Sequence, residues 1–218
     1  MDYSRRPIDQ ASLRHAFCVA TGEETTMSQQ ASFPGFAQPV ATDRLFLAIF
    51  PDRDTADGLA AFAAAQCAHY GLHGKPLATD RFHVTLFHLG DSVGLRPDVV
   101  EAARAAAAQV AAVPFDVVFD QVTSFDAHRE KSPFVLTADH GNEPLHVFQT
   151  GLGVRLREAG LGRCATTGFK PHLTLAYDRR VIAPESVAPI AWRAEEFVLV
   201  YSLLGQTRHI PLARWPLG

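Results

Sequence analysis

The sequence predicts an α+β fold whose antiparallel strands form two lobes. Short strand-like segments outnumber the helical ones, and the strand, helix, strand order of the first half returns approximately in the second. The composition suits a packed domain, since 47% of the 218 residues are hydrophobic and 20% are charged. We expect residues 1–42 to form a flexible tail and residues 43–218 to form one bilobal domain.

The tail is predicted because these residues are rich in Ser, Thr, Gln, Gly and Pro and show little helical or strand periodicity. One hypothesis is that translation begins at Met27 rather than at Met1. The intact mass of the natively expressed protein would test this hypothesis.

The first expected strand covers residues 44–50 and ends at Pro51. An Ala-rich helix is predicted for residues 54–69, before Gly71, and a second strand for residues 83–90. The next helix should begin at Pro97, because proline suits the first helical turn, and should run to about residue 112. An amphipathic helix is expected at about 143–159, with leucines and a phenylalanine on one side. The remaining predicted strands are 115–124, 133–139, 172–177, 195–204 and 208–215.

No apolar run in the sequence is long enough for a membrane-spanning helix. The three cysteines, Cys18, Cys67 and Cys164, are widely spaced and form no CxxC pair, which is typical of reduced thiols. We therefore expect a cytoplasmic protein with no membrane partner. We also expect a monomer. The net charge of -3 argues against a large footprint on long nucleic acid, so an RNA end, a nucleotide or a short oligomer fits better.

Two short motifs share one pattern: HVTL begins at His83 and HLTL begins at His172. Strand alternation puts His83 and Thr85 on one face, and His172 and Thr174 on one face, while the aliphatic residues between them point the other way. Each motif therefore offers an imidazole and a hydroxyl, and the two motifs could meet across a cleft.

This pairing suits phosphoryl chemistry without a metal or another cofactor. One neutral histidine can accept a proton from water, and a second, protonated histidine can donate to the leaving oxygen. A threonine hydroxyl can donate a hydrogen bond to a non-bridging phosphate oxygen. A single HxT motif is weak evidence, whereas two matched copies in strand-like segments are much stronger. Among the other histidines, His209 is expected to be solvated or locally hydrogen-bonded, and His88 has the opposite strand parity to His83.

Four blocks in order, RLFLAIFPD, RFHVTLFHLGD, GFKPHLTLAYDRR and EEFVLVYSLLGQTRHIPLARWPL, resemble the 2H phosphoesterase superfamily. Within it, the chain is similar to bacterial RNA 2',3'-cyclic phosphodiesterases, also called 2'-5' RNA ligases. The resemblance implies a bilobal, pseudo-twofold fold with the histidines in a central cleft. It also implies an enzyme that opens a 2',3'-cyclic phosphate, on an RNA 3'-end or a small cyclic nucleotide, to a 2'-phosphomonoester. We expect His83 to be the proton donor and His172 the proton acceptor, with Thr85 and Thr174 binding phosphate.

Two positions depart from the pattern of similar proteins. Relatives commonly carry Arg five residues after the second catalytic histidine, where this chain has Tyr177, and they often have Phe where this chain has His88. Lys170 has the same strand parity as His172 and is our candidate for the missing cation, with Arg179 and Arg180 as alternatives.

Three phenylalanines, Phe46, Phe50 and Phe125, are candidates for base stacking, although an aromatic residue at strand spacing usually packs in the core. Arg129 and Lys131 could reach an RNA backbone or form a solvated loop.

Three alternatives stay open: RNA 2'-5' ligation or another small 2'-phosphodiester substrate, a module that binds RNA ends or cyclic nucleotides without turnover, and a histidine metal site. Hydrolysis and ligation pass through the same transition state, so sequence does not separate them. The metal site is disfavoured because the usual local ligand pairs are missing.

Overall fold

The computed structural model describes residues 40–125, 130–165 and 168–218. The predicted tail lies outside the described residues except for residues 40–42, and so do Met27, Cys18 and Arg129. The tail and the start site at Met27 therefore stay predictions.

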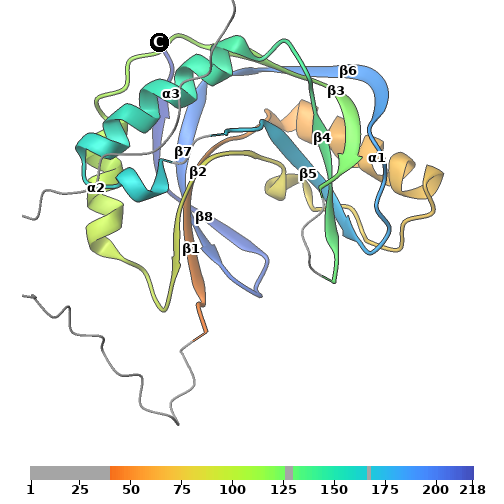
Figure 1. Ribbon diagram of the computed structural model, residues 1–218, viewed down its shortest axis with the longest axis horizontal. Coiled ribbons are helices and arrows are strands. Elements are labelled where there is room, and N and C mark those ends of the chain that lie inside the picture. Colours follow the sequence, from red (N-terminus) through yellow and green to blue (C-terminus); the bar gives the residue numbers. More distant parts are fainter. Residues whose placement is uncertain (1–39, 126–129, 166–167) are drawn as a thin grey trace, which may run out of the picture. The chain divides into compact units, whose positions relative to one another are not determined.

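Eight strands and three α-helices, with two short 3₁₀ helices, make up the described part of the chain (Figure 1). In chain order they are β1 (Asp43–Ile49), α1 (Arg53–His69), η1 (Thr79–Arg81), β2 (Val84–Ser92), α2 (Pro97–Ala107), β3 (Phe115–Ser124), β4 (Ser132–Thr137), α3 (Glu143–Glu158), η2 (Gly162–Cys164), β5 (His172–Asp178), β6 (Glu185–Ala194), β7 (Glu196–Leu203) and β8 (Arg208–Pro216).

The strands form one antiparallel sheet in the order β6-β3-β4-β5-β2-β1-β7-β8. The α+β class is confirmed, whereas the strands expected in two sheets are joined in one. The join is narrow, because β2 and β5 pair only at Val84 and Leu173. The two HxT motifs therefore meet at this junction.

Strand β6 was missed by the sequence analysis, and its position in the sheet explains why. It lies at one edge of the sheet and pairs only with β3. Pro189 lies near the register shift between Phe119 and Gln121 on β3. Proline is tolerated on edge strands and at irregularities. Most residues of β6 are exposed or only partly buried, so its sequence shows little of the apolar alternation that predicts a strand.

The helices begin where the sequence predicts. Asp52 caps α1, since its side chain accepts a hydrogen bond from Thr55 N at 2.9 Å, and Pro97 opens α2. α2 and α3 lie side by side (Figure 1). α3 buries the apolar face expected from its periodicity: Leu145, Phe148, Leu152 and Leu156.

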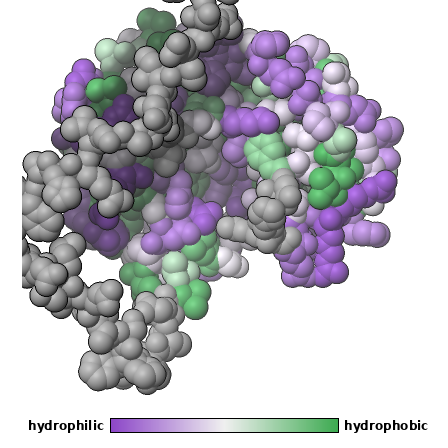
Figure 2. Space-filling model, in the orientation of Figure 1, coloured by the Kyte–Doolittle hydropathy of each residue, from purple (hydrophilic) through white to green (hydrophobic). Residues whose placement is uncertain are grey.

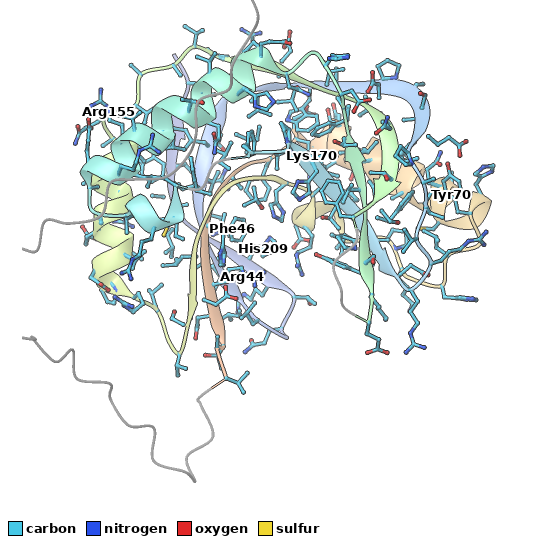
Figure 3. The ribbon with its side chains drawn as sticks, viewed as in Figure 1. Arg44, Phe46, Tyr70, Arg155, Lys170 and His209 are labelled. Carbon is cyan, nitrogen blue, oxygen red and sulfur yellow. The ribbon has the colours of Figure 1, made fainter. Side chains whose placement is uncertain are left out.

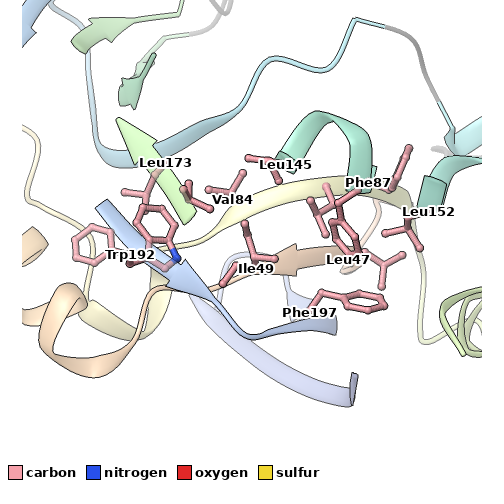
Figure 4. Packing of buried hydrophobic residues seen from close by; sticks show 14 of the residues in the cluster. Leu47, Ile49, Val84, Phe87, Leu145, Leu152, Leu173, Trp192 and Phe197 are labelled. Atoms are coloured by element: carbon pink, nitrogen blue, oxygen red, sulfur yellow. The ribbon is translucent and has the colours of Figure 1, made fainter. Parts of the chain in front are cut away.

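One main hydrophobic cluster supports the junction from behind. Val84 and Leu173 are fully buried and belong to the same cluster as Ile49 on β1 and Leu145 on α3 (Figure 4). Because these side chains fix the strand faces that point into the core, they also fix the opposite faces, which carry the histidines and threonines.

On the face shown in Figure 2, hydrophilic residues cover much of the surface and hydrophobic residues form small separate groups. Among the described residues, no helix is both long enough and apolar enough to cross a lipid bilayer.

Candidate active site

The two HxT motifs lie next to each other at the junction of β2 and β5. Val84 opposite Leu173 is an antiparallel pair, so His83 lies toward Thr174 and Thr85 lies toward His172. The histidines and threonines are partly exposed, while the aliphatic residues between them are buried. The alternation predicted from the sequence is therefore confirmed for both motifs.

A cavity of about 570 Å³ contains His83, Thr85, His172 and Thr174. Its walls also include Arg44, Phe46, Arg81, His88, Tyr177 and His209. This volume is within the usual range for a small-molecule site. Figure 3 shows Arg44 and Phe46 on β1 close to His209 on β8.

A register shift in each motif strand brings a third residue to the cavity face. Thr85 pairs with Ala48 and Phe87 with Leu47, so Leu86 is an extra residue on β2. The bulge reverses the alternation, and His88 therefore lies on the same face as Thr85 although their spacing is odd. The opposite face that strand parity predicts for His88 is therefore wrong.

The second motif has the same irregularity at the same place. Thr174 pairs with Val135 and Ala176 with Phe134, so Leu175 is the extra residue on β5. Tyr177 consequently faces the cavity, with 46% of the residue exposed. The position where relatives commonly carry Arg is thus on the cavity wall in this chain and presents a phenol.

The two imidazoles are held in the same way. His83 Nδ1 donates to the carbonyl oxygen of Arg81 at 2.7 Å, and His172 Nδ1 donates to that of Lys170 at 2.8 Å. A carbonyl oxygen only accepts, which makes Nδ1 the protonated nitrogen of each neutral ring. Each Nε2 is left with a lone pair when the ring is neutral and with a proton when it is charged. Either histidine can therefore serve as base or acid.

Aromatic rings pack against His83. Phe46 stacks on it with 5.0 Å between ring centroids, and Phe50 lies tilted at 5.7 Å. His209 meets His83 edge-on at 5.1 Å and Phe46 at 5.2 Å. His209 is therefore part of the cavity wall, and the expectation of a solvated or merely local role was wrong. The sequence analysis missed it because β8 is brought beside the cavity by pairing with β7, which pairs with β1, and strand periodicity does not show this pairing.

His172 has a different surrounding. Phe125 contacts it edge-on at 4.9 Å between centroids, and Lys170 Nζ lies 5.0 Å from the Phe125 ring centre. The three phenylalanines proposed for base stacking thus contact catalytic-candidate histidines: Phe46 and Phe50 at the first motif, Phe125 at the second.

Burial lowers the pKa of both histidines. Burial lowers the pKa of His83 to about 4. The hydrogen bond to the Arg81 carbonyl raises this pKa, whereas the nearby charges of Arg81 and His172 lower it further. The pKa of His172 is also lowered, mainly by burial. Burial and the neighbouring His83 lower the pKa of His209 to about 3. In the protein without a bound ligand, these three imidazoles are therefore neutral at pH 7.

The basic side chains proposed as the substitute cation lie elsewhere. Lys170 lines a groove with Phe125 outside the walls of the histidine cavity. Arg179 pairs with Glu130, and Arg180 donates to the carbonyl oxygen of Tyr70 at 2.7 Å. Lys131 lines a further pocket near Arg179. A role for any of them in substrate binding stays a proposal, whereas Arg44 and Arg81 line the cavity itself.

Hydrogen bonds join the segment before His83 to strand β5, which carries His172. Leu77 N donates to the carbonyl oxygen of the bulged Leu175 at 2.8 Å. The Asp178 carboxylate accepts hydrogen bonds from His73 N at 2.7 Å and Gly74 N at 2.6 Å. These bonds fix the two motifs relative to each other in addition to the pairing at Val84.

Gly74 cannot carry a side chain without displacing this contact. A Cβ atom there would lie 2.1 Å from the carbonyl oxygen of Tyr177. We expect Gly74→Ala to lower the free energy of unfolding by about 2–3 kcal/mol, the scale of overpacking a rigid site. Thermal or urea unfolding would measure it. Gly58→Ala in α1 is the matched control, because nothing lies within 4 Å of its Cβ position. Equal loss of stability in both variants would contradict the fastening role of Gly74.

In the described part of the chain, no three side chains of His, Cys, Asp or Glu come together in a way that could hold a metal ion.

Comparison with known proteins decides the relationship. Residues 50–205 match the 2'-5' RNA ligase superfamily, a span that includes both HxT motifs. The chain belongs to this superfamily. The resemblance expected from the sequence is thereby confirmed. Four residues of the cavity wall lie outside the matched span: Arg44, Phe46, Thr207 and His209. A search of curated proteins found no significant match.

Solved structures share the superfamily fold with this chain. LigT of E. coli is 22% identical with a TM-score of 0.62, and the match covers 82% of this chain and 99% of LigT. A protein described as a phosphoesterase is 21% identical with a TM-score of 0.62, over 80% of this chain and 98% of the other. The protein TT0787 of Thermus thermophilus is 23% identical with a TM-score of 0.59, over 80% and 97%. LigT has also been solved in complexes with 3'-AMP and with NADP+.

Proposed function

We propose that this protein hydrolyses a 2',3'-cyclic phosphate, on an RNA 3'-end or a small nucleotide, to a 2'-phosphomonoester without a metal. One observation carries the proposal: two imidazoles, each with Nδ1 bonded to a backbone carbonyl, and two threonine hydroxyls line one cavity. The complexes of LigT with 3'-AMP and NADP+ support a ligand of nucleotide size. With the function we propose a cytoplasmic monomer and a bilobal, pseudo-twofold arrangement of the domain, for which the antiparallel meeting of the motifs is the support.

The proposed step uses the four side chains as follows. The neutral histidine accepts a proton from water as the water oxygen bonds to phosphorus. The bond from phosphorus to the 3'-oxygen breaks, and the protonated histidine donates its proton to that oxygen. Thr85 and Thr174 donate hydrogen bonds to the non-bridging oxygens, where negative charge increases in the transition state.

Two assignments of proton donor and proton acceptor are possible for the two histidines. The sequence-based proposal makes His83 the proton donor and His172 the acceptor. Burial lowers the pKa of both rings, and that of His83 to about 4, which favours His83 as the ring that stays neutral and therefore the reverse order. The charge of the bound phosphate favours protonation of both rings. The two assignments are distinguished by the pH dependence of His83→Ala and His172→Ala, since each variant keeps only the acid or only the base.

The test is to incubate the purified protein and EDTA with an oligoribonucleotide ending in 2',3'-cyclic phosphate, and to identify the product. We expect a 2'-phosphate and indifference to EDTA. A 3'-phosphate would reject the proposed regiochemistry. Tight binding without product would favour a binding module, and joining to a 5'-hydroxyl oligonucleotide would favour ligation. Dependence on added zinc would reject the metal-free mechanism.

A further inference from the structure

The cavity contains two guanidinium groups whose partners differ. Arg44 donates from Nε and Nη2 to the two carboxylate oxygens of Asp91, at 2.7 Å each. Asp91 also accepts from His88 Nε2 at 2.8 Å. The charge of Arg44 is therefore already balanced by a carboxylate inside the cavity wall.

Arg81 has no such partner among the residues that the structure describes. No carboxylate there lies within ion-pair distance of it. Its Nε–H is buried and has no hydrogen-bond acceptor within residues 40–125, 130–165 and 168–218. Buried N–H groups of charged side chains are normally satisfied, so an unpaired one in a cavity wall indicates a group that an anionic ligand completes.

The backbone of Arg81 is held beside His83. It ends η1, and the next residue, Phe82, is fully buried and anchors the turn. Its carbonyl oxygen accepts the Nδ1 hydrogen of His83. The same residue thus orients the imidazole through its backbone and faces the cavity with its side chain.

The charge of Arg81 acts on two histidines of the cavity. It lowers the pKa of His83 and that of His209, and all three residues line the same cavity. An oxyanion next to Arg81 would offset this effect and favour protonation of a histidine. A phosphate bound there would consequently promote the charged imidazole that the proposed reaction needs.

We infer that the Arg81 guanidinium binds the non-bridging oxygens of the substrate phosphate and supplies the cation that position 177 lacks. The fork of a guanidinium matches two phosphate oxygens, and a partly buried site strengthens such a pair. This inference rests on the proposed function for the identity of the substrate. It does not rest on it for the binding of phosphate itself.

The test compares wild-type protein with Arg81→Gln and Arg81→Lys. Inorganic phosphate is the probe for binding, followed by calorimetry, and a 2',3'-cyclic mononucleotide is the probe for turnover. We expect Arg81→Gln to weaken phosphate binding and to lower kcat/KM by about 10- to 100-fold each, the scale of losing a charged hydrogen-bond pair. Arg81→Lys keeps the charge without the fork, so it should recover part of both losses.

Two controls separate binding from folding. Arg155→Gln removes an exposed arginine of α3 that pairs with Glu158, far from His209 in Figure 3, and should change neither measurement. The carbonyl of residue 81 remains in every variant, so the His83 Nδ1–H signal in NMR spectra should persist.

The outcomes are distinguishable. If Arg81→Gln loses phosphate binding and the wild-type protein does not hydrolyse the cyclic nucleotide, the inference is upheld and the proposed function is rejected. Turnover by the wild-type protein, with equal phosphate binding and equal KM in Arg81→Gln, would overturn the inference and leave the function intact. Failure of the wild-type protein to bind phosphate would also overturn the inference.

Discussion

Replacement of His83 or of His172 by alanine should lower kcat for a 2',3'-cyclic phosphate by about 100- to 10,000-fold, the usual scale for losing a positioned acid or base. Both rings line one cavity with Nδ1 bound to a backbone carbonyl, so each variant removes one Nε2 from the same reaction. Steady-state hydrolysis of a cyclic mononucleotide, with EDTA present, measures the effect.

The double variant should be little worse than the weaker single variant, because groups that act in one step are not additive. His140→Ala is the control, since His140 is exposed and lies outside the cavity walls. Unchanged hydrolysis by both single variants would reject an acid and base role for the pair.

Replacement of Thr85 or of Thr174 by valine should lower kcat by about 100-fold each, within the range found for removing one hydrogen-bond donor to a developing negative charge. Valine keeps the branched shape that suits a strand and removes only the hydroxyl. The loss should fall mainly on kcat rather than on KM, because the hydrogen bond strengthens in the transition state.

Serine is the informative partner substitution at these two positions. Thr85→Ser and Thr174→Ser restore the hydroxyl and should recover most of the activity. If the serine variants were as slow as the valine variants, the threonines would act through strand packing, and their proposed contact with phosphate would be wrong.

The local part of the site could be predicted from the sequence because it depends on strand alternation alone. His83, Thr85, His172 and Thr174 follow a two-residue period, and buried neighbours such as Val84 enforce it. The starts of the helices could also be predicted from the sequence, since proline and aspartate mark their first turns.

The rest of the cavity depends on pairing between distant strands. The bulges at Leu86 and Leu175 exist only relative to the partner strands β1 and β4, so the cavity-facing positions of His88 and Tyr177 could not be predicted from periodicity. His209 reaches His83 because β8 pairs with β7, which pairs with β1.

The substitute cation shows the same limit. Strand parity pointed equally to Lys170 and to Arg81, each two residues before a histidine, and the sequence analysis considered only Lys170. The contact of Lys170 with Phe125 and the unpaired Nε–H of Arg81 are tertiary features. They separate two positions that are equivalent in the sequence.

The pH dependence of wild-type and single-variant proteins tests the two-histidine claim most directly. Activity should rise with pH as the base loses its proton and fall as the acid loses its proton, which gives a bell-shaped profile. Since burial lowers the pKa of both histidines, the profile of kcat/KM, which reports the free enzyme, should be centred at acidic pH. The bound phosphate favours the charged rings, so the profile of kcat should be centred at higher pH. Each alanine variant should lose one limb of the bell, and an unchanged bell in both variants would contradict the account.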